Sequence, residues 1–189
     1  MKVNKMIGYF EVKGEDTLRN FAVYVLLAKH KENGSLKLYV GKTGDNRTGC
    51  NPVISRIGNH FSFNGTHSQI RNKIQSVENQ YVENFDYEYF YLHENAYSNV
   101  ETERSESVKK INEYERVLNR KSTAICESIK IEHLNPLGNY AKKDSCHQVD
   151  AKYEKINTFL NYILDNSKFL SKLEYDVKRE LNKKFTIIN

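Results

Sequence analysis

Arg56, His60 and Glu127 are residue types that can take part in phosphodiester hydrolysis. That reaction needs a group that accepts a proton from water, positive charge against the transition state, and help for the departing oxygen. Arg56 and His60 are four residues apart on a predicted helix, so both project from one side of it. Glu127 is predicted on a partly apolar helix face, where a metal ion or an Arg would offset the cost of burying a carboxylate. Each also has an ordinary structural explanation: a surface Arg near an unrelated His, and a carboxylate in a salt bridge.

Two tyrosines, Tyr24 and Tyr39, lie on neighbouring predicted strands. A two-residue turn would pair Ala28 with Tyr39 and leave the tyrosines about 13 Å apart along the strands. A longer turn would pair Tyr24 directly with Tyr39. Either register keeps both rings on one face of the sheet, and a slip of one residue would not. Paired tyrosines in a sheet are most often core residues, so the pair alone does not indicate a site.

The elements that would position these residues follow from the hydrophobic pattern. It predicts strands over 21–28 and 36–41, joined by a turn at Asn33-Gly34, and a third strand over 85–92. It also predicts a helix opened by Asn51-Pro52, with Asn51 as its cap, and a helical stretch near 67–80. Helix is predicted again over about 102–134, with a break near Ser122, and two amphipathic helices follow in roughly the last forty residues. The order predicts an α+β domain with a small antiparallel three-stranded sheet flanked by helices and a C-terminal helical extension.

Positive charge is concentrated in one segment of the chain. Residues 29–73 contain eight basic residues against Glu32 and Asp45, and the remainder has 21 basic and 22 acidic residues. The basic ones are Lys29, Lys31, Lys37, Lys42, Arg47, Arg56, Arg71 and Lys73. The segment is typical of a surface that binds a polyanion, and a solvated lysine-rich face is the alternative.

Composition and hydropathy indicate where the protein works. Three widely spaced cysteines favour a reducing compartment over a disulfide framework or a zinc site. No stretch approaches the roughly 20 apolar residues of a membrane span, and the first residues do not resemble a signal peptide. We therefore expect a cytoplasmic protein that does not enter a membrane.

Several of these residues, taken together and in order, resemble the motifs of the GIY-YIG nucleases. The matching residues are Ala22-Val23-Tyr24, Tyr39-Val40-Gly41-Lys42, Arg56 on the next helix, His60 four residues later, and Glu127 followed by Pro136 and Asn139. Ala22 stands where the family has its first Gly. The resemblance covers roughly residues 21–140, and it implies a catalytic domain over 1–140 with a helical insertion at about 62–82. Residues 141–189 would then be a helical extension that packs on the core or forms a dimer interface.

The resemblance also implies a role for each residue. Tyr24 would be the general base or would position the attacking water, and Tyr39 would hydrogen-bond near the phosphate. Lys42 or the metal would assist a tyrosine, whose ordinary pKa is near 10. The remaining roles are these: Arg56 would stabilise the pentavalent phosphorus, His60 would orient Tyr24 or serve the leaving group, Glu127 would be the only protein ligand of Mg²⁺ (or Mn²⁺), and Asn139 would tie the end of the Glu-bearing helix to the site.

These expectations point to a metal-dependent DNA endonuclease, most similar to the stand-alone type II restriction endonucleases of that family. Double-stranded DNA would be the substrate, and a homodimer and a cognate methyltransferase in the same system would be the protein partners. Two alternatives stay open: a phage or mobile-element endonuclease, and a non-catalytic nucleic-acid-binding module with the same fold.

Overall fold

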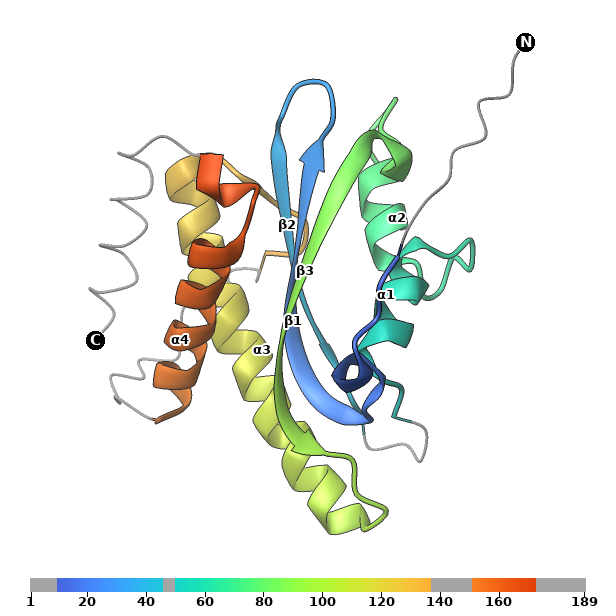
Figure 1. The fold of residues 1–189 in the computed structure, drawn as a ribbon, viewed down its shortest axis with the longest axis vertical. Helices are drawn as coiled ribbons and strands as arrows, with labels where there is room; N and C mark the ends of the chain where they lie inside the picture. Colours follow the sequence, from blue (N-terminus) through green and yellow to red (C-terminus); the bar gives the residue numbers. More distant parts are fainter. Residues whose placement is uncertain (1–9, 46–49, 137–150, 173–189) are drawn as a thin grey trace.

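The computed structural model describes residues 10–45, 50–136 and 151–172 (Figure 1). The strands are β1 (Asn20–His30), β2 (Leu36–Thr43), β3 (Phe85–Ala96) and β4 (Glu132–His133). The helices are α1 (Val53–Phe61), α2 (Gln69–Gln75), α3 (Glu101–Ile129) and α4 (Ala151–Asn166), with 3-10 turns η1 (Gly14–Thr17), η2 (Val82–Asn84) and η4 (Leu170–Lys172).

The described strands form one mixed sheet in the order β3-β1-β2-β4. β1 pairs antiparallel with both β2 and β3, and β4 pairs parallel with β2 at Lys37 and Leu38. The α+β class is therefore confirmed, and the prediction of a three-stranded antiparallel sheet is wrong. The fourth strand was missed because it is only two residues long and was included in the predicted helix over 102–134.

The β1–β2 hairpin has a register between the two that the turn signal allowed. Leu26 pairs with Tyr39 and Tyr24 pairs with Gly41, so neither predicted pairing of Tyr39 occurs. The loop is longer than two residues, because the backbone N–H of His30 bonds to the carbonyl of Ser35. The observed register is shifted by two residues from each predicted register. A shift by an even number of residues keeps the side chains on the same face, so Tyr24 and Tyr39 share one face, as expected.

Helices cover both faces of the sheet, and β1 is buried between them. Successive β1 residues alternate between two cores: Val23, Val25 and Leu27 belong to the core that contains α3 and α4 residues. Tyr24 and Leu26 belong to the core that contains α2 residues and is bordered by Phe61 of α1. Figure 1 shows the same arrangement, with α3 and α4 on one side of the sheet and α1 and α2 on the other. A strand covered on both faces needs the continuous hydrophobic run seen in its sequence.

The ends of two helices differ from the predictions. Pro52, not Asn51, is the N-cap of α1, and no side chain caps that helix. α3 continues through Ser122 without a break and stops at Ile129, where Lys130 adopts the left-handed conformation at φ 57° and bonds to the carbonyl of Cys126. The predicted helix near 67–80 is confirmed only over α2.

α4 packs into the same core as the sheet and α3. Its residues Ile156, Phe159, Leu160 and Ile163 are all buried there. Of the second predicted C-terminal helix, only η4 lies within the described residues. The described helices include none that is both long and apolar enough to cross a membrane.

Candidate active site

Tyr24, His60 and Arg56 form a hydrogen-bonded group between β1 and α1. The Tyr24 hydroxyl lies 2.6 Å from Nε2 of His60, and Nε of Arg56 donates to the same hydroxyl at 3.3 Å. A guanidinium has only donors, so the Tyr24 oxygen accepts from Arg56 and its own proton is directed to His60. The neutral imidazole then carries its proton on Nδ1, which has no hydrogen-bond partner among the described residues. The predicted pairing of Arg56 and His60 on one side of a helix is found, and Tyr24 joins them.

Burial keeps the two central groups of this network uncharged. It lowers the pKa of His60 to about 3, and the positive charge of Arg56 adds to that effect. Burial also raises the pKa of the Tyr24 hydroxyl well above its ordinary value, and the nearby Tyr39 contributes in the same direction. At neutral pH Tyr24 therefore keeps its proton and shares it in a hydrogen bond with the neutral His60 Nε2.

Tyr24 is held in a stack of three tyrosine rings. Its ring centroid lies 4.9 Å from that of Tyr89 and 6.2 Å from that of Tyr39. Gly41 lies directly across the hairpin, and a Cβ there would be 2.3 Å from the Tyr24 hydroxyl oxygen. Gly41 is therefore needed for close approach, since any side chain would displace the ring.

A pocket of about 660 Å³ opens at the end of β2. Tyr39, Lys42, Arg56 and Glu115 are among its lining residues. Tyr24 and His60 do not line it and are completely buried. A bound phosphate would therefore meet Tyr39 and Arg56, with Tyr24 and His60 behind them.

Glu115 is the acidic residue that α3 contributes to this pocket. Its carboxylate is 3.7 Å from Nζ of Lys42, and that ammonium also donates to the side chain of Asn112. Burial raises the pKa of the Glu115 carboxyl, while Lys42 and Arg56 partly offset the shift. The carboxylate is thus only partly compensated, and a bound cation would stabilise its charged form.

The short β4 allows a residue of α3 to reach this pocket. β4 pairs with β2 only at Lys37 and Leu38. Farther along β2, the side chain of Asn135 takes over the edge: its Oδ1 accepts from the N–H of Val40 at 3.0 Å, and its Nδ2 donates to the Val40 carbonyl at 2.6 Å. Since no strand of the described chain covers β2 beyond Leu38, Glu115 can approach around that edge.

The structure does not bring Glu127 to the pocket. Glu127 is exposed, and it lies twelve residues after Glu115, about 18 Å farther along α3. The partly apolar face predicted for Glu127 belonged to a helix that continued to about residue 134, but α3 ends at Ile129. The role of Glu127 as a metal ligand stays a prediction, and Glu115 is the carboxylate of α3 that lines the pocket.

Asn139 lies outside the described residues, and its predicted role stays a prediction. Asn135, four residues earlier, joins α3 to β2. Besides bonding Val40, Asn135 accepts at its carbonyl from Nδ2 of Asn119 on α3, at 2.9 Å. It therefore links α3 to β2 next to the pocket. Sequence reasoning missed both Glu115 and Asn135. The signal that could have found Glu115 is its spacing, because it lies four residues after Ile111 and three before Leu118, both fully buried.

The donor set of the pocket fits a hard divalent cation. Within the described residues, no three His, Cys, Asp or Glu side chains come together as a metal cluster. Asp45 and Glu115 are the carboxylates that line the pocket. Together with nearby hydroxyl and amide oxygens they are unsuited to structural zinc, but they suit Mg²⁺, which commonly takes one or two carboxylates and keeps several waters. Glu115 is the residue that would hold such an ion.

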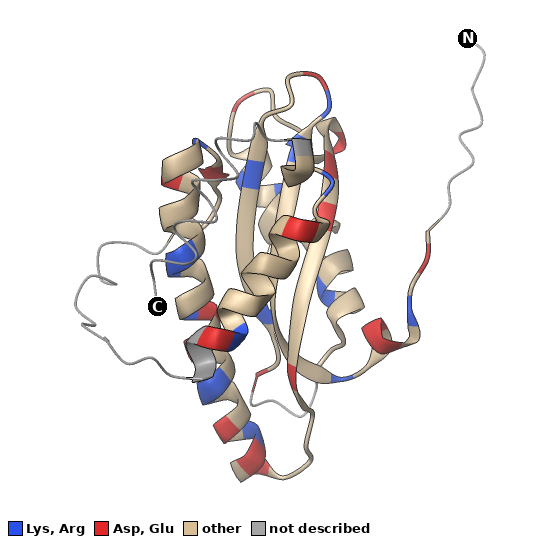
Figure 2. Cartoon of the chain, turned by 60° about the vertical axis from the view of Figure 1, so that its left-hand side comes forward, with Lys and Arg blue, Asp and Glu red and all other residues tan. Residues whose placement is uncertain are grey.

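The basic segment is more than a solvated face. Lys37 is 4% exposed and pairs with Glu132, while Lys42 and Arg56 line the pocket. Along α3, by contrast, acidic and basic residues are interspersed (Figure 2). Lys37 and Lys42 are thus each paired with a carboxylate, whereas Arg56 bonds to the Tyr24 hydroxyl.

Comparisons of the chain with protein-family models, with curated proteins and with solved structures find no match. A family assignment consequently depends on the order of the motif residues and on the geometry of the site that they form.

Proposed function

We propose that this protein is a Mg²⁺-dependent DNA endonuclease of the GIY-YIG type. The observation that carries the proposal is the convergence of Tyr39, Arg56 and Glu115 on one pocket, with the hydrogen-bonded Tyr24–His60 pair directly behind it. A cation, a neutral hydroxyl and a carboxylate around one cavity are the groups that phosphodiester hydrolysis requires.

Arg56 is the residue best suited to bind the scissile phosphate. Its Nε is engaged by Tyr24, which fixes the guanidinium while its other donors remain for phosphate oxygens. Burial opposes the charge of Arg56, but the surrounding tyrosine oxygens offset it and the pKa of the guanidinium is raised. A preorganised positive charge at this position would stabilise the developing negative charge of the transition state.

Tyr39 is the tyrosine that we expect to touch the substrate, and Tyr24 acts through it and through Arg56. Tyr39 is 7% exposed and lines the pocket, whereas Tyr24 is fully buried. Tyr24 is thus a positioning residue: it orients Arg56, and its hydroxyl donates a hydrogen bond to His60. Lys42 neutralises Glu115 in the absence of a metal ion. When a bound cation neutralises Glu115 instead, Lys42 can turn toward a phosphate.

A Mg²⁺ ion held by Glu115 would supply Lewis-acid stabilisation and lower the pKa of a bound water. Duplex DNA is the proposed substrate, and a type II restriction enzyme, active as a homodimer alongside a cognate methyltransferase, is the specific form that we favour.

Cleavage of a supercoiled plasmid by the purified protein tests the proposal. Nicked and linear products should form in Mg²⁺ and be absent in EDTA, and a restriction enzyme should give discrete fragments from a longer DNA. DNA binding without any cleavage in Mg²⁺ or Mn²⁺ would support the non-catalytic module instead, and neither binding nor cleavage would refute the proposal.

A further inference from the structure

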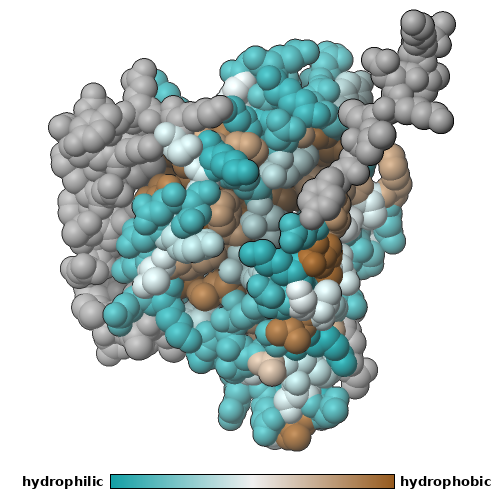
Figure 3. All heavy atoms as spheres, viewed as in Figure 1, coloured by the Kyte–Doolittle hydropathy of each residue, from teal (hydrophilic) through white to brown (hydrophobic). Residues whose placement is uncertain are grey.

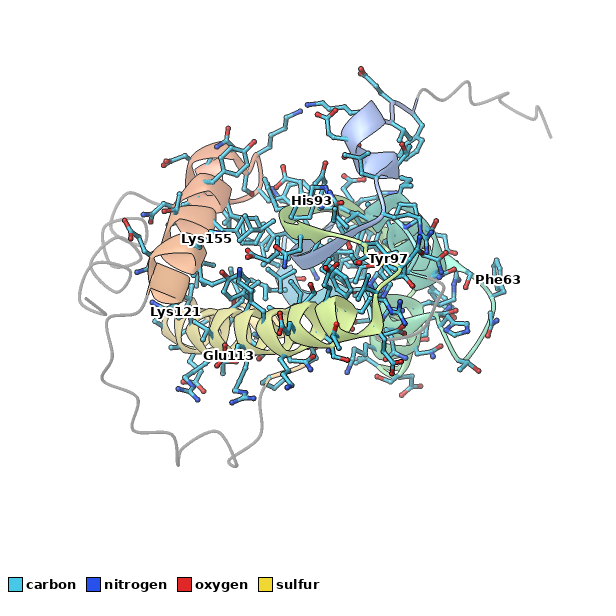
Figure 4. All side chains as sticks on the ribbon, turned by 90° about the horizontal axis from the view of Figure 1, so that it is seen from below. Phe63, His93, Tyr97, Glu113, Lys121 and Lys155 are labelled. Carbon is cyan, nitrogen blue, oxygen red and sulfur yellow. The ribbon has the colours of Figure 1, made fainter. Side chains whose placement is uncertain are left out.

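The loop between α1 and α2, which contributes His67 to the pocket, presents an aromatic ring to solvent. Phe63 is 89% exposed, the highest value among the large hydrophobic residues of the described chain. On the face drawn in Figure 3, hydrophobic residues occur in several separate groups among hydrophilic ones. Figure 4 shows Phe63 standing out from its loop at the outer edge of the molecule. An exposed Phe side chain forgoes the stabilisation that burial would give, so its position calls for an explanation.

The ring is supported from one side by Arg71. The guanidinium carbon of Arg71 lies 4.1 Å from the Phe63 ring centroid. Arg71 is itself fixed, because its Nε and Nη2 donate to the Phe61 carbonyl at 3.1 and 3.0 Å and its Nη1 is 3.3 Å from Glu83. The ring therefore rests on a positively charged platform while most of its surface faces water.

The loop that carries Phe63 is tied together by its own hydrogen bonds. The Asn64 carbonyl accepts from the backbone N–H groups of His67 and Ser68, both at 3.1 Å. The Asn64 side chain accepts from the N–H of Thr66 at 3.1 Å, and Asn72 of α2 donates to the Gly65 carbonyl at 2.7 Å. Phe63 thus projects from a preorganised turn, which lowers the entropy cost of using it for binding.

The same loop reaches the pocket and lies in a segment without negative charge. His67 lines the pocket together with Arg56 and Asn59. The sequence contains no Asp or Glu between Asp45 and Glu78, a range that includes all of α1, the loop and α2. A polyanion bound at Arg56 can therefore extend over this loop without meeting a carboxylate of the segment.

We propose that Phe63 stacks on an unpaired base of the DNA next to the scissile phosphate, with Arg71 as the support of the ring. This inference rests on the proposed function. Every base has a π face, so an exposed ring backed by a guanidinium binds an unstacked base without reading its sequence. The predicted substrate preference is DNA that already has an unpaired base at the site, since such DNA needs no energy for unstacking.

Binding of two matched probes tests the proposal. One is a DNA duplex with a single bulged adenine, the other is the same duplex fully paired, and fluorescence anisotropy in Ca²⁺ measures both affinities. The variants are Phe63→Ala and the aromatic replacement Phe63→Trp. Tyr162→Ala is the control, because Tyr162 is a 56% exposed aromatic residue of α4 in the layer across the sheet.

We expect the parent protein to bind the bulged probe more tightly than the paired one. Phe63→Ala should weaken binding to the bulged probe about 10-fold and leave the paired probe within about 2-fold, while Phe63→Trp and Tyr162→Ala keep the parental preference. Equal loss on both probes, or no loss, would overturn the stacking role even if the protein cuts DNA. A parent protein that binds neither probe would overturn the proposed function and this inference with it.

Discussion

Replacing Gly41 by Ala should destabilise the protein through the Tyr24 ring. The new methyl carbon would lie 2.3 Å from the Tyr24 hydroxyl oxygen, 2.4 Å from Cζ and 2.8 Å from Cε2, all far inside van der Waals contact. The ring cannot move freely, because Tyr39 and Tyr89 stack against it and its hydroxyl is bonded to His60. Overpacking costs about 1–3 kcal/mol, and a displaced ring would leave the buried His60 nitrogen unsatisfied at a further 1–3 kcal/mol or so.

The expected loss in the free energy of unfolding is therefore about 2–6 kcal/mol. For a chain of this size that corresponds to a fall in Tm of about 4–24 °C. Urea unfolding followed by circular dichroism measures the loss. Gly58→Ala is the matched control: Gly58 lies in α1, a Cβ there would meet nothing within 4 Å, and the change should stabilise the helix by about 0.5–1 kcal/mol.

A double-mutant cycle with Tyr24→Ala isolates the contact. In the Tyr24→Ala background, Gly41→Ala should cost less than about 0.5 kcal/mol, since the obstructing ring is gone. If Gly41→Ala costs the same in both backgrounds, or if the single variant is as stable as the parent, then Gly41 does not accommodate Tyr24 and the packing described for the site is wrong.

Three further predictions concern the site and the core. Arg56→Ala should lower the single-turnover cleavage rate at saturating enzyme on the order of 10²-fold, and Arg56→Lys should not restore it because an ammonium lacks the planar fork; parental cleavage by Arg56→Ala would reduce Arg56 to a binding residue. His60 should titrate near pH 3 by NMR. Its pKa in the folded state is below the unfolded value near 6.5, so the unfolded state binds more protons as the pH falls between these two values. The stability contributed by neutral His60 is therefore complete above pH 6.5 and is lost as the pH falls toward 3, on the order of 5 kcal/mol at most. A His60 pKa near 6.5 would contradict its burial. Leu160→Ala should lower the free energy of unfolding by about 2–5 kcal/mol since α4 is part of the main core. Tyr162→Ala removes only an edge contact with Phe90 and should lower it by about 1 kcal/mol or less. Equal effects in urea unfolding would mean that α4 does not pack as described.

The sequence predicted the elements with strong local signals. The Arg56–His60 spacing placed both side chains on one side of α1, and the period of two in β1 and β2 placed Tyr24 and Tyr39 on one face. Both inferences depend only on helix and strand geometry, which explains why they hold although the turn length was not known.

The parts that failed depend on contacts between residues far apart in the sequence. The end of α3 is set by the left-handed Lys130, a position that no glycine marks, so the helical pattern was continued too far and Glu127 was given neighbours that are not on its helix. Glu115 reaches the pocket only because β4 is short and Asn135 occupies the edge of β2, a tertiary arrangement with no local signal. The motif spacing favoured Glu127, and the structure favours Glu115.

Cleavage by Glu115→Gln and Glu127→Gln, measured side by side, tests the central claim most directly. Glutamine keeps the size of each side chain and removes the charge that would hold Mg²⁺. In single-turnover plasmid cleavage with Mg²⁺, Glu115→Gln should lose activity while still binding DNA in Ca²⁺, and the exposed Glu127→Gln should cut at close to the parental rate. Parental cleavage by Glu115→Gln, or loss of cleavage confined to Glu127→Gln, would contradict the metal site that is proposed here.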